Sequence, residues 1–417
     1  MKGSWSAVEA LLRSSVGRVA QAMVLLVVHS DEAVFEAAYG QLDNGLQQQP
    51  TQLSTRFDLA SVTKLFTATA FMRLVDQGLV ALDQPVANVI PEFAGVRPIG
   101  GSEDPLAKVP ISPNPAYVGQ VVDAGRVTFR QLLTHTSGLP AWRSVYLEAG
   151  PVPPAPGEPV ADPGVEERIH RALTAIVRYP FIYPPGEDLV YSDIGLILLG
   201  ESVARLLGKR LDRAVEELVL SPLGLCHTGY RPLDMRNRHQ VDDIAATEFC
   251  AWRKRRLRGE VHDENAAGMG GVAGHAGLFG TAADVAKLAS LYLHGGTVTK
   301  GVLPGGRGER KACLLRPETV ADMISEQVRQ PGPGGVRRGL GWMLRAREGA
   351  SCGRYFSQNS FGHTGFTGTS VWVDPTVGLI VVLLTNRVYY GRDPAGITAL
   401  RPALHDAVWE AVLGNGG

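Results

Sequence analysis

The sequence lacks an excess of either charge, has few cysteines and contains no long hydrophobic run. Lysine and arginine together number 41, as do aspartate and glutamate, so no net charge points to nucleic acid or membrane lipid as a partner. No apolar stretch approaches the length of a transmembrane helix. The four cysteines form no C-x-x-C pair, which argues against a metal or redox motif; they are Cys226, Cys250, Cys313 and Cys352. We therefore expect reduced, buried thiols, no membrane span, no metal and no cofactor.

The rest of the composition is that of an ordinary globular protein, with 45% hydrophobic and 20% charged residues in 417. Near the N-terminus, the apolar run at residues 23–28 is too short for a signal peptide and has no small-residue cleavage site after it, which predicts a cytoplasmic location. Residues 24–28 and 33–39 flank a polar turn and predict a β-hairpin. Apolar residues at helical spacing precede this hairpin: Val8, Leu11, Leu12, Val16 and Val19.

Helices dominate the middle of the chain, and strands lie toward its two ends. Apolar spacing predicts helices at residues 61–79, 189–207, 283–293 and 402–412. Paired strands are predicted at residues 369–373 and 379–384. Three stretches are predicted to be loops, namely residues 97–120, 150–164 and 330–339. Because no linker or repeat interrupts the chain, we expect the strands of both ends to share one sheet, with the helical middle inserted between them.

The strongest chemical signal is Ser61-Val62-Thr63-Lys64 at the start of a predicted helix. Positions i and i+3 of a helix lie on one face, so the Ser61 hydroxyl and the Lys64 amine can meet. A serine hydroxyl needs a nearby base to take its proton, and a desolvated lysine can serve as that base. The helix start also leaves N–H groups free for an oxyanion. An S-x-x-K match by itself also arises by chance.

Two further motifs follow in order: Tyr191-Ser192-Asp193 immediately before the helical residues 194–207, and His363-Thr364-Gly365 before a predicted strand. Together with Ser61 and Lys64 they resemble the S-x-x-K, Y-x-N and K-T-G motifs of serine β-lactamases and D-alanyl-D-alanine peptidases. The resemblance also covers connecting segments such as VTFRQLLTHTSGLP and GLFGTAADVAKLA. It is closest to the group of class C β-lactamases, DD-carboxypeptidases and family VIII esterases, and it spans nearly the whole chain.

The resemblance implies an α/β fold of the α+β type, β-lactamase/transpeptidase-like. A mostly antiparallel sheet flanked by helices would lie beside an all-helical region. One catalytic domain would span residues 1–417, with the α/β part at about 1–60 and 270–417 and the helical part at about 61–269.

The resemblance also implies a role for each motif residue. Ser61 is then the nucleophile, and Lys64 and Tyr191 shuttle protons. The backbone N–H groups of Ser61 and Phe366 form the oxyanion hole. The strand at Thr364 and Gly365 approaches the substrate, and the side chain before it, His363, contacts the substrate or tunes Tyr191.

Two residues depart from the family pattern. Asp193 replaces the usual amide; a carboxylate can only accept hydrogen bonds, and its charge favours protonated Lys64. His363 replaces the usual lysine, so a fixed cation becomes a group expected to titrate near neutrality. Both departures favour a substrate other than a β-lactam, with recognition of an amine or hydroxyl as one option.

Three other motifs have simpler interpretations. The G-x-S-x-G match at residues 349–353 lacks the required strand before and helix after it, and we interpret it as a loop. The turn at residues 135–138 is expected to pack beside the site. Metal binding by His262, Asp263 and His275 is not expected from their spacing, although Asp263, Asn265 or His275 can line the site.

These observations predict a serine hydrolase that forms an acyl-enzyme with a small ester, amide or peptide substrate. We expect an ester or small-acyl hydrolase first. A D-alanyl-D-alanine carboxypeptidase or β-lactamase is the alternative, and a catalytically silent binding protein is an alternative of another class.

Overall fold

The computed structural model describes residues 4–43, 45, 49–156, 164–233, 243–299 and 310–414. Within these residues one large sheet has eight antiparallel strands, in the order β14-β15-β16-β17-β18-β19-β1-β2. In that order their bounds are Val328–Arg329, Arg337–Arg338, Met343–Leu344, Phe361–Thr364, Ser370–Asp374, Leu379–Thr385, Ala22–His29 and Glu32–Gly40. Strands from both ends of the chain therefore lie in the same sheet, as expected.

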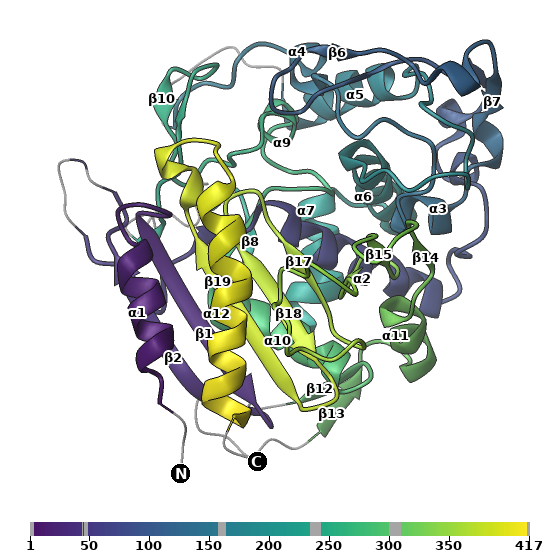
Figure 1. The fold of residues 1–417 in the computed structure, drawn as a ribbon. Helices are drawn as coiled ribbons and strands as arrows, with labels where there is room; N and C mark the ends of the chain where they lie inside the picture. Colours follow the sequence, from purple (N-terminus) through teal and green to yellow (C-terminus); the bar gives the residue numbers. More distant parts are fainter. Residues whose placement is uncertain are drawn as a thin grey trace.

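Helices cover both faces of this sheet and form a separate group beside it (Figure 1). The α-helices α1 to α12 are Ser6–Ser15, Thr63–Asp76, Phe129–Leu133, Val145–Ala149, Val165–Ile176, Asp193–Leu207, Leu211–Val215, Ser221–Leu223, Glu264–Gly268, Ala282–Leu293, Pro317–Ile324 and Ala395–Leu413. A π-helical turn at Glu216–Leu220 links α7 and α8. No helix of the described ranges is long and apolar enough to cross a membrane.

Short strands outside the large sheet pair locally. They are β3 Phe57–Asp58, β4 Val96–Pro98, β5 Ser102–Glu103, β6 Pro110–Ile111, β7 Val121–Asp123, β8 Gly229–Tyr230, β9 Phe249–Cys250, β10 Arg255–Arg256, β11 Leu278–Gly280, β12 Thr297–Thr299 and β13 Arg310–Cys313. The three-stranded sheet β3-β11-β8 matters most for the site, because β3 leads directly into the segment that carries Ser61.

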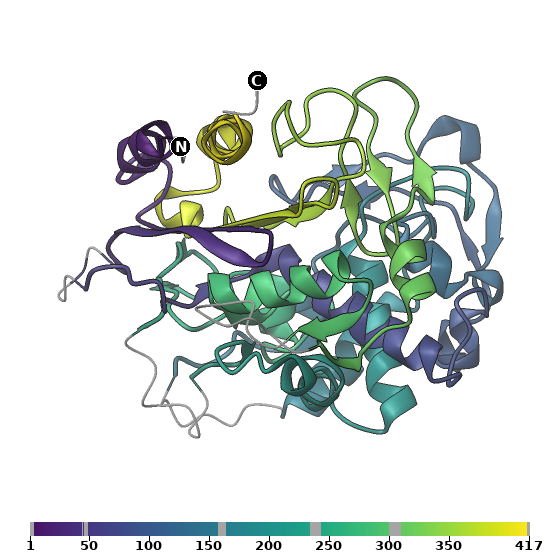
Figure 2. The same cartoon turned by 90° about the horizontal axis from the view of Figure 1, so that it is seen from below.

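The alternation of side chains along β1 explains why the sheet needs helices on both faces. Met23, Leu25 and Val27 pack in one core with α1 and α12, whereas Leu26 and Val28 belong to the other core, which includes α10 and α2. Figure 2 shows purple α1 and yellow α12 on one side of the strands and green α10 on the other. Because β1 is buried on both faces, its sequence is a continuous run of apolar residues and does not alternate with polar ones.

The predicted hairpin is confirmed, with strands longer than expected and a turn at Ser30 and Asp31, both at positive φ. The first helix ends at Ser15, so the apolar spacing at Val16 and Val19 continues beyond it. The last helix starts at Ala395, and Pro402 lies inside it. The predicted start at Pro402 was therefore too late by about two turns. Proline is favoured in the first turn of a helix, which made this residue a plausible start.

Two of the predicted loops were wrong in part. Residues 330–339 include β15, an internal strand of the large sheet, and residues 97–120 include short paired strands. Strands of two or three residues are too short to show the alternation of apolar and polar residues that marks a strand. The prediction therefore followed the local composition, which is typical of loops. Of the third predicted loop, residues 157–163 lie outside the described residues.

All four cysteines are free thiols, in line with the expectation, but Cys226 and Cys313 are exposed rather than buried. The G-x-S-x-G match lies in turns between β16 and β17, with neither the strand before it nor the helix after it that this motif requires. Its interpretation as a loop is confirmed.

Candidate active site

Ser61 lies in a tight turn between β3 and α2, in a 3-10 segment at Ala60–Val62. Ala60 has φ +47°, a left-handed conformation that costs a non-glycine residue energy. The buried Asp58 carboxylate stabilises the turn by accepting the Ala60 N–H at 2.8 Å. Burial raises the pKa of Asp58, and the hydrogen bonds from Ala60 and His262 oppose that rise. A strained turn held by buried neighbours is typical of a functional site.

The Lys64 side chain is fully buried, and its ammonium has three partners. It donates to Ser61 Oγ at 2.8 Å and to the His275 carbonyl at 3.0 Å, and it lies 2.8 Å from Asp193 Oδ1. Burial acts to lower the pKa of Lys64, but Asp193 and then Tyr191 outweigh it, so this pKa lies above its usual value. The expectation that Asp193 favours protonated Lys64 is confirmed.

Tyr191 is held between positively charged and aromatic groups just before α6. Lys64 Nζ lies 4.9 Å and Arg338 Cζ 5.0 Å from the centre of the Tyr191 ring. The His135 ring lies 4.5 Å from the Tyr191 ring, centre to centre, and the His363 ring 6.1 Å from it. The segment is fixed because the Ser192 N–H donates to His135 Nδ1 at 3.0 Å.

His363 lies on β17 and is fully buried. Its Nδ1 donates to the Thr364 carbonyl at 2.9 Å, and among the described residues its buried Nε2 has no hydrogen-bond partner. Burial, followed by the charges of Arg338 and Lys64, holds the pKa of His363 well below its ordinary value. The expectation of a group titrating near neutrality was therefore wrong, because the side chain is buried among cations.

The chain after β17 lies directly against the nucleophile turn. A Cβ added to Gly365 would lie 2.1 Å from Thr369 Oγ1 and 2.8 Å from the Leu59 carbonyl, so only glycine fits there. The Thr367 hydroxyl donates to the Asp58 carbonyl at 2.8 Å, and the Thr369 hydroxyl donates to the Leu59 carbonyl at 3.0 Å. These bonds bring the segment that contains Phe366 to the turn that carries Ser61.

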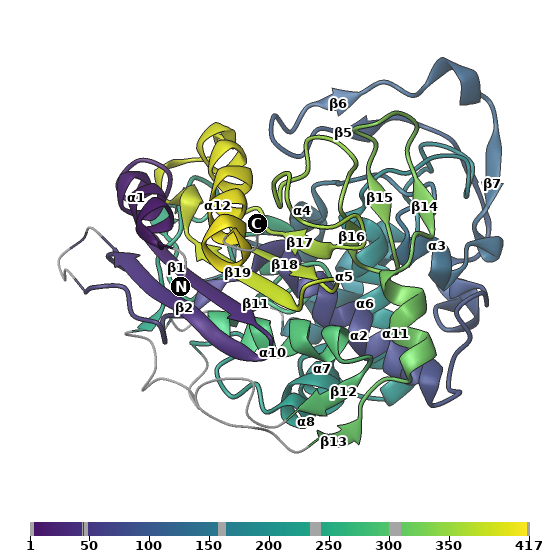
Figure 3. The same cartoon turned by 60° about the horizontal axis from the view of Figure 1, so that its bottom comes forward.

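The structure adds a buried cation that the sequence interpretation missed. Arg338, on β15, is almost fully buried, and its Nε and Nη1 have no partner among the described residues. Burial lowers its pKa to about 10, and Tyr191 partly offsets that effect. Strand β15 reaches the site because it is two strands from β17 (Figure 3). The glycine- and proline-rich segment around it concealed the strand, so no sequence signal marked this arginine.

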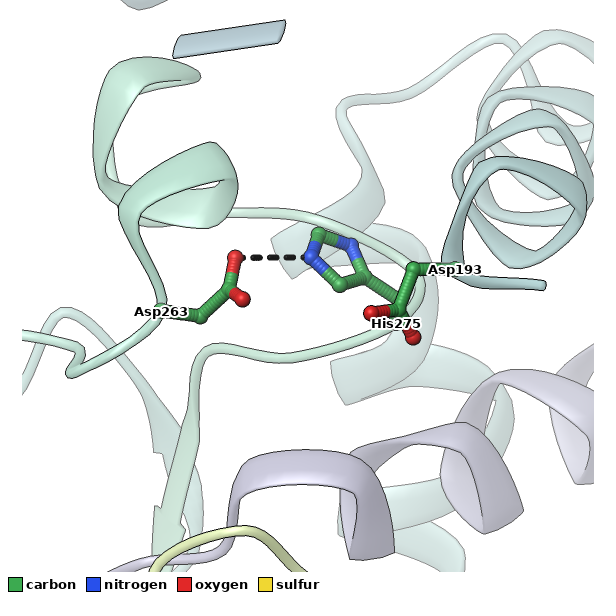
Figure 4. Close-up of side chains that lie close together, drawn as sticks. All are labelled: Asp193, Asp263 and His275. Carbon is green, nitrogen blue, oxygen red and sulfur yellow. Dashed lines mark hydrogen bonds and ion pairs between the residues drawn. The ribbon is translucent and has the colours of Figure 1, made fainter. Parts of the chain in front are cut away.

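Asp263, at the start of α9, and His275 also belong to the site (Figure 4). His275 Nε2 lies 2.8 Å from Asp263 Oδ1, and both side chains offer an atom within 4.8 Å of an Asp193 oxygen. Burial alone would raise the pKa of Asp263, but His275 and the Ala266 N–H hold it well below its usual range. These three residues could together hold a cation, and the Lys64 ammonium already lies beside Asp193. Asn265, the other suggested lining residue, instead binds backbone at Tyr146 and Arg143.

Comparisons with known proteins identify the family to which the chain belongs. The family model named Beta-lactamase matches residues 8–405. A putative D-alanyl-D-alanine carboxypeptidase of Escherichia coli (strain K12) is 33% identical over 384 residues, which cover 87% of this chain and 77% of that protein. An N-acetylmuramyl-L-alanine amidase of Bacillus subtilis (strain 168) is 32% identical over 385 residues, covering 87% and 76%.

A solved structure of similar fold is that of EstCE1, described as a hydrolase with promiscuous acyltransferase activity. Its TM-score is 0.67 at 22% identity, and the match covers 96% of this chain and 98% of that one. The expected β-lactamase/transpeptidase-like fold is thus confirmed. The chain belongs to the Beta-lactamase family and is a serine hydrolase of the superfamily that also includes the penicillin-binding proteins.

Proposed function

We propose that this protein hydrolyses an amide bond next to a carboxylate, as a D-alanyl-type carboxypeptidase acting through an acyl-Ser61 intermediate. The observation that carries the proposal is the 2.8 Å hydrogen bond between Lys64 and the partly exposed Ser61 hydroxyl, beside Tyr191. A serine that is accessible to substrate and hydrogen-bonded to a buried amine is arranged for nucleophilic attack.

Protons move within this group during acylation. The Lys64 ammonium donates to Ser61 Oγ and so holds the hydroxyl in place, while Tyr191 acts as the base in its phenolate form and takes the Ser61 proton as Oγ attacks the substrate carbonyl. Lys64 and Arg338 flank the Tyr191 ring and stabilise the phenolate before it takes up the proton. The same proton passes to the leaving amine when the C–N bond breaks. In the second half-reaction Tyr191 takes a proton from water, which attacks the acyl-enzyme carbonyl. The proton then passes to Ser61 Oγ as the ester bond breaks and the acid is released.

The tetrahedral intermediate carries a negative oxygen that needs donors. The backbone N–H groups of Ser61 and Phe366 are proposed to supply them, since the Gly365 segment packs against the nucleophile turn. The Phe366 N–H has no hydrogen bond to any residue in the described part of the chain, so it is free for a ligand.

Arg338 supports the choice of a carboxylate-bearing substrate. A buried guanidinium with two nitrogens lacking a partner among the described residues is costly unless a ligand pairs with it, and its planar fork suits a carboxylate. Because Arg338 lies beside Tyr191, which is proposed to protonate the leaving amine, we propose that this carboxylate lies on the leaving-group side of the scissile bond. The names of the Escherichia coli and Bacillus subtilis relatives, a putative D-alanyl-D-alanine carboxypeptidase and an N-acetylmuramyl-L-alanine amidase, also point to an amide bond.

Ester or small-acyl hydrolysis is the second candidate, and Asp193 favours it. This residue replaces an amide that could donate to an acylamino carbonyl, and it pairs instead with Lys64. An ester substrate has less need of that donor.

Purified protein should be incubated with a diacyl-L-Lys-D-Ala-D-Ala peptide, a muramyl-L-alanyl dipeptide, p-nitrophenyl esters and a chromogenic cephalosporin, beside Ser61→Ala and Arg338→Met variants. The proposal predicts D-alanine release by the wild type, none by Ser61→Ala, and a rise in KM of about tenfold or more for Arg338→Met on the peptide but not on uncharged esters. Turnover of esters alone would favour the second candidate. Muramyl amide cleavage without D-alanine release would place the scissile bond elsewhere in the peptide.

A further inference from the structure

We infer that Arg401, on helix α12, is a positioning residue that aims and polarises the Phe366 N–H of the proposed oxyanion hole. The inference rests on the proposed function and extends it to a residue outside all three sequence motifs. Arg401 is buried in the interior of α12, on the side of the helix that faces the sheet.

Arg401 joins the two ends of the loop formed by residues 365–369. Its Nη2 donates to the Gly365 carbonyl at 3.0 Å and to the Thr369 carbonyl at 2.8 Å. The same two residues also pair through the backbone, because the Gly365 N–H donates to the Thr369 carbonyl at 2.7 Å. One guanidinium therefore fixes both ends of the loop at once.

The covalent geometry of the peptide bond carries this restraint to Phe366. The Gly365 carbonyl and the Phe366 N–H belong to one planar unit, which is trans like the other peptide bonds of the described ranges. In a trans unit the C=O and N–H bonds point in opposite directions. Fixing the carbonyl on Arg401 therefore fixes the N–H on the opposite side, away from α12.

A second arginine holds the next peptide unit. Arg387 Nε donates to the Phe366 carbonyl at 2.8 Å, and its guanidinium lies 4.6 Å from the centre of the Phe366 ring. Both peptide units that flank the Phe366 Cα are thus held through their carbonyls by cations. A rotation that turned the Phe366 N–H away from the site would have to break the Arg401 bond.

Charge adds to the positioning effect. A cation that accepts electron density from a carbonyl strengthens the N–H of the same amide as a donor, and it does so more strongly in a buried environment. Burial, and then the charge of Arg387, lowers the pKa of Arg401 to about 9, which reflects how unfavourable this place is for a cation.

A matched control exists in Arg97, on β4. This arginine is equally buried, donates to two backbone carbonyls (Tyr179 and Phe93), and also has an Nε with no partner among the described residues. Its hydrogen-bond and ring partners in the described part of the chain are Tyr179, Phe93 and Phe181, none of which belongs to the site. Arg97→Met therefore removes a similar buried cation without touching the oxyanion hole.

The test compares Arg401→Met, Arg401→Lys and Arg97→Met by three measurements: the rate of Ser61 labelling by a fluorophosphonate, the inhibition constant of an aryl boronic acid, and Tm. For Arg401→Met we expect labelling slowed by about tenfold to a hundredfold and boronate binding weakened by a similar factor. Arg401→Lys should recover part of both, and with a substrate the loss should fall on kcat rather than KM. Arg97→Met should lower Tm while leaving labelling and boronate binding unchanged.

Equal losses in labelling for Arg401→Met and Arg97→Met would overturn the inference, as would a labelling rate unchanged in Arg401→Met. If Arg401→Met does not fold, Arg401→Lys is compared with Arg97→Lys by the same three measurements. Slower labelling in Arg401→Lys alone would then support the inference, and equal labelling in both would overturn it. Failure of the proposed function looks different, because it shows in the wild type itself. Without Ser61 as nucleophile the wild type is not labelled at Ser61, and with a different substrate class it is labelled but releases no D-alanine.

Discussion

The pairing of Lys64 with Asp193 is the unusual chemical feature of this site. Three partners occupy the buried ammonium, and one of them is a carboxylate at 2.8 Å. Because Asp193 favours the charged form of Lys64, the lysine gives up its proton only with difficulty. Proton transfer from Ser61 then depends more heavily on Tyr191.

Replacing Asp193 by asparagine tests this dependence. The Lys64 pKa should fall, because burial would then act with less opposition. Because Lys64 acts as the ammonium, the alkaline limb of kcat/KM should move to lower pH by about one unit, and acylation by a β-lactam should become faster. Asp212→Asn removes the carboxylate of an exposed ion pair with Arg210 and should leave the pH profile unchanged. An unshifted alkaline limb in Asp193→Asn would contradict this account of the residue.

At the scale of elements, the site forms where two short segments meet: the turn between β3 and α2, and the loop after β17. Hydrogen bonds from Thr367 and Thr369 to the backbone before Ala60 join them. Helix α2 contributes Lys64 one turn after Ser61, as its i, i+3 spacing requires.

The strain in the nucleophile turn predicts the effect of Ala60→Gly. Glycine adopts φ +47° without steric cost, so the free energy of unfolding should rise by up to about 1 kcal/mol. Ala70→Gly, in the interior of α2, should instead lower it by about 1 kcal/mol or more. Chemical denaturation measures both values. A destabilised Ala60→Gly variant would mean that the turn is not strained.

The sequence predicted the elements with long apolar patterns and the motifs that they carry. The hairpin, α10, β18, β19 and the order of the three motifs follow from local periodicity and residue type. Arg338 and Arg401 could not be found in this way. Arg338 reaches the site through sheet pairing of two-residue strands, and Arg401 through the packing of α12 on the sheet, and neither relation leaves a local pattern.

At the scale of the whole molecule, buried histidines link stability to pH. Burial holds the pKa values of His135 and His363 well below 6.5 and that of His405 at about 4. The unfolded chain takes up protons at these residues below about pH 6.5, whereas the folded protein does not, so their contribution is complete above that pH and is lost as the pH falls.

Thermal or urea unfolding between pH 8 and pH 4 checks this link. Stability should fall steeply below pH 6.5, with His405 alone contributing about 3 kcal/mol by pH 4. His405→Gln should flatten the slope, whereas His170→Gln, at an exposed position, should not. A His405→Gln variant with the wild-type slope would show that acid sensitivity arises elsewhere.

The most direct test of the central claim is to locate the covalent adduct after reaction with a fluorophosphonate. Trypsin cleaves after Arg56 and Lys64, so Ser61 lies in the peptide of residues 57–64, while the serine of the G-x-S-x-G match lies in the peptide of residues 348–354. We predict one adduct per chain, on Ser61, and none in Ser61→Ala. Label on the 348–354 peptide, or undiminished labelling of Ser61→Ala, would contradict the assignment of Ser61 as nucleophile.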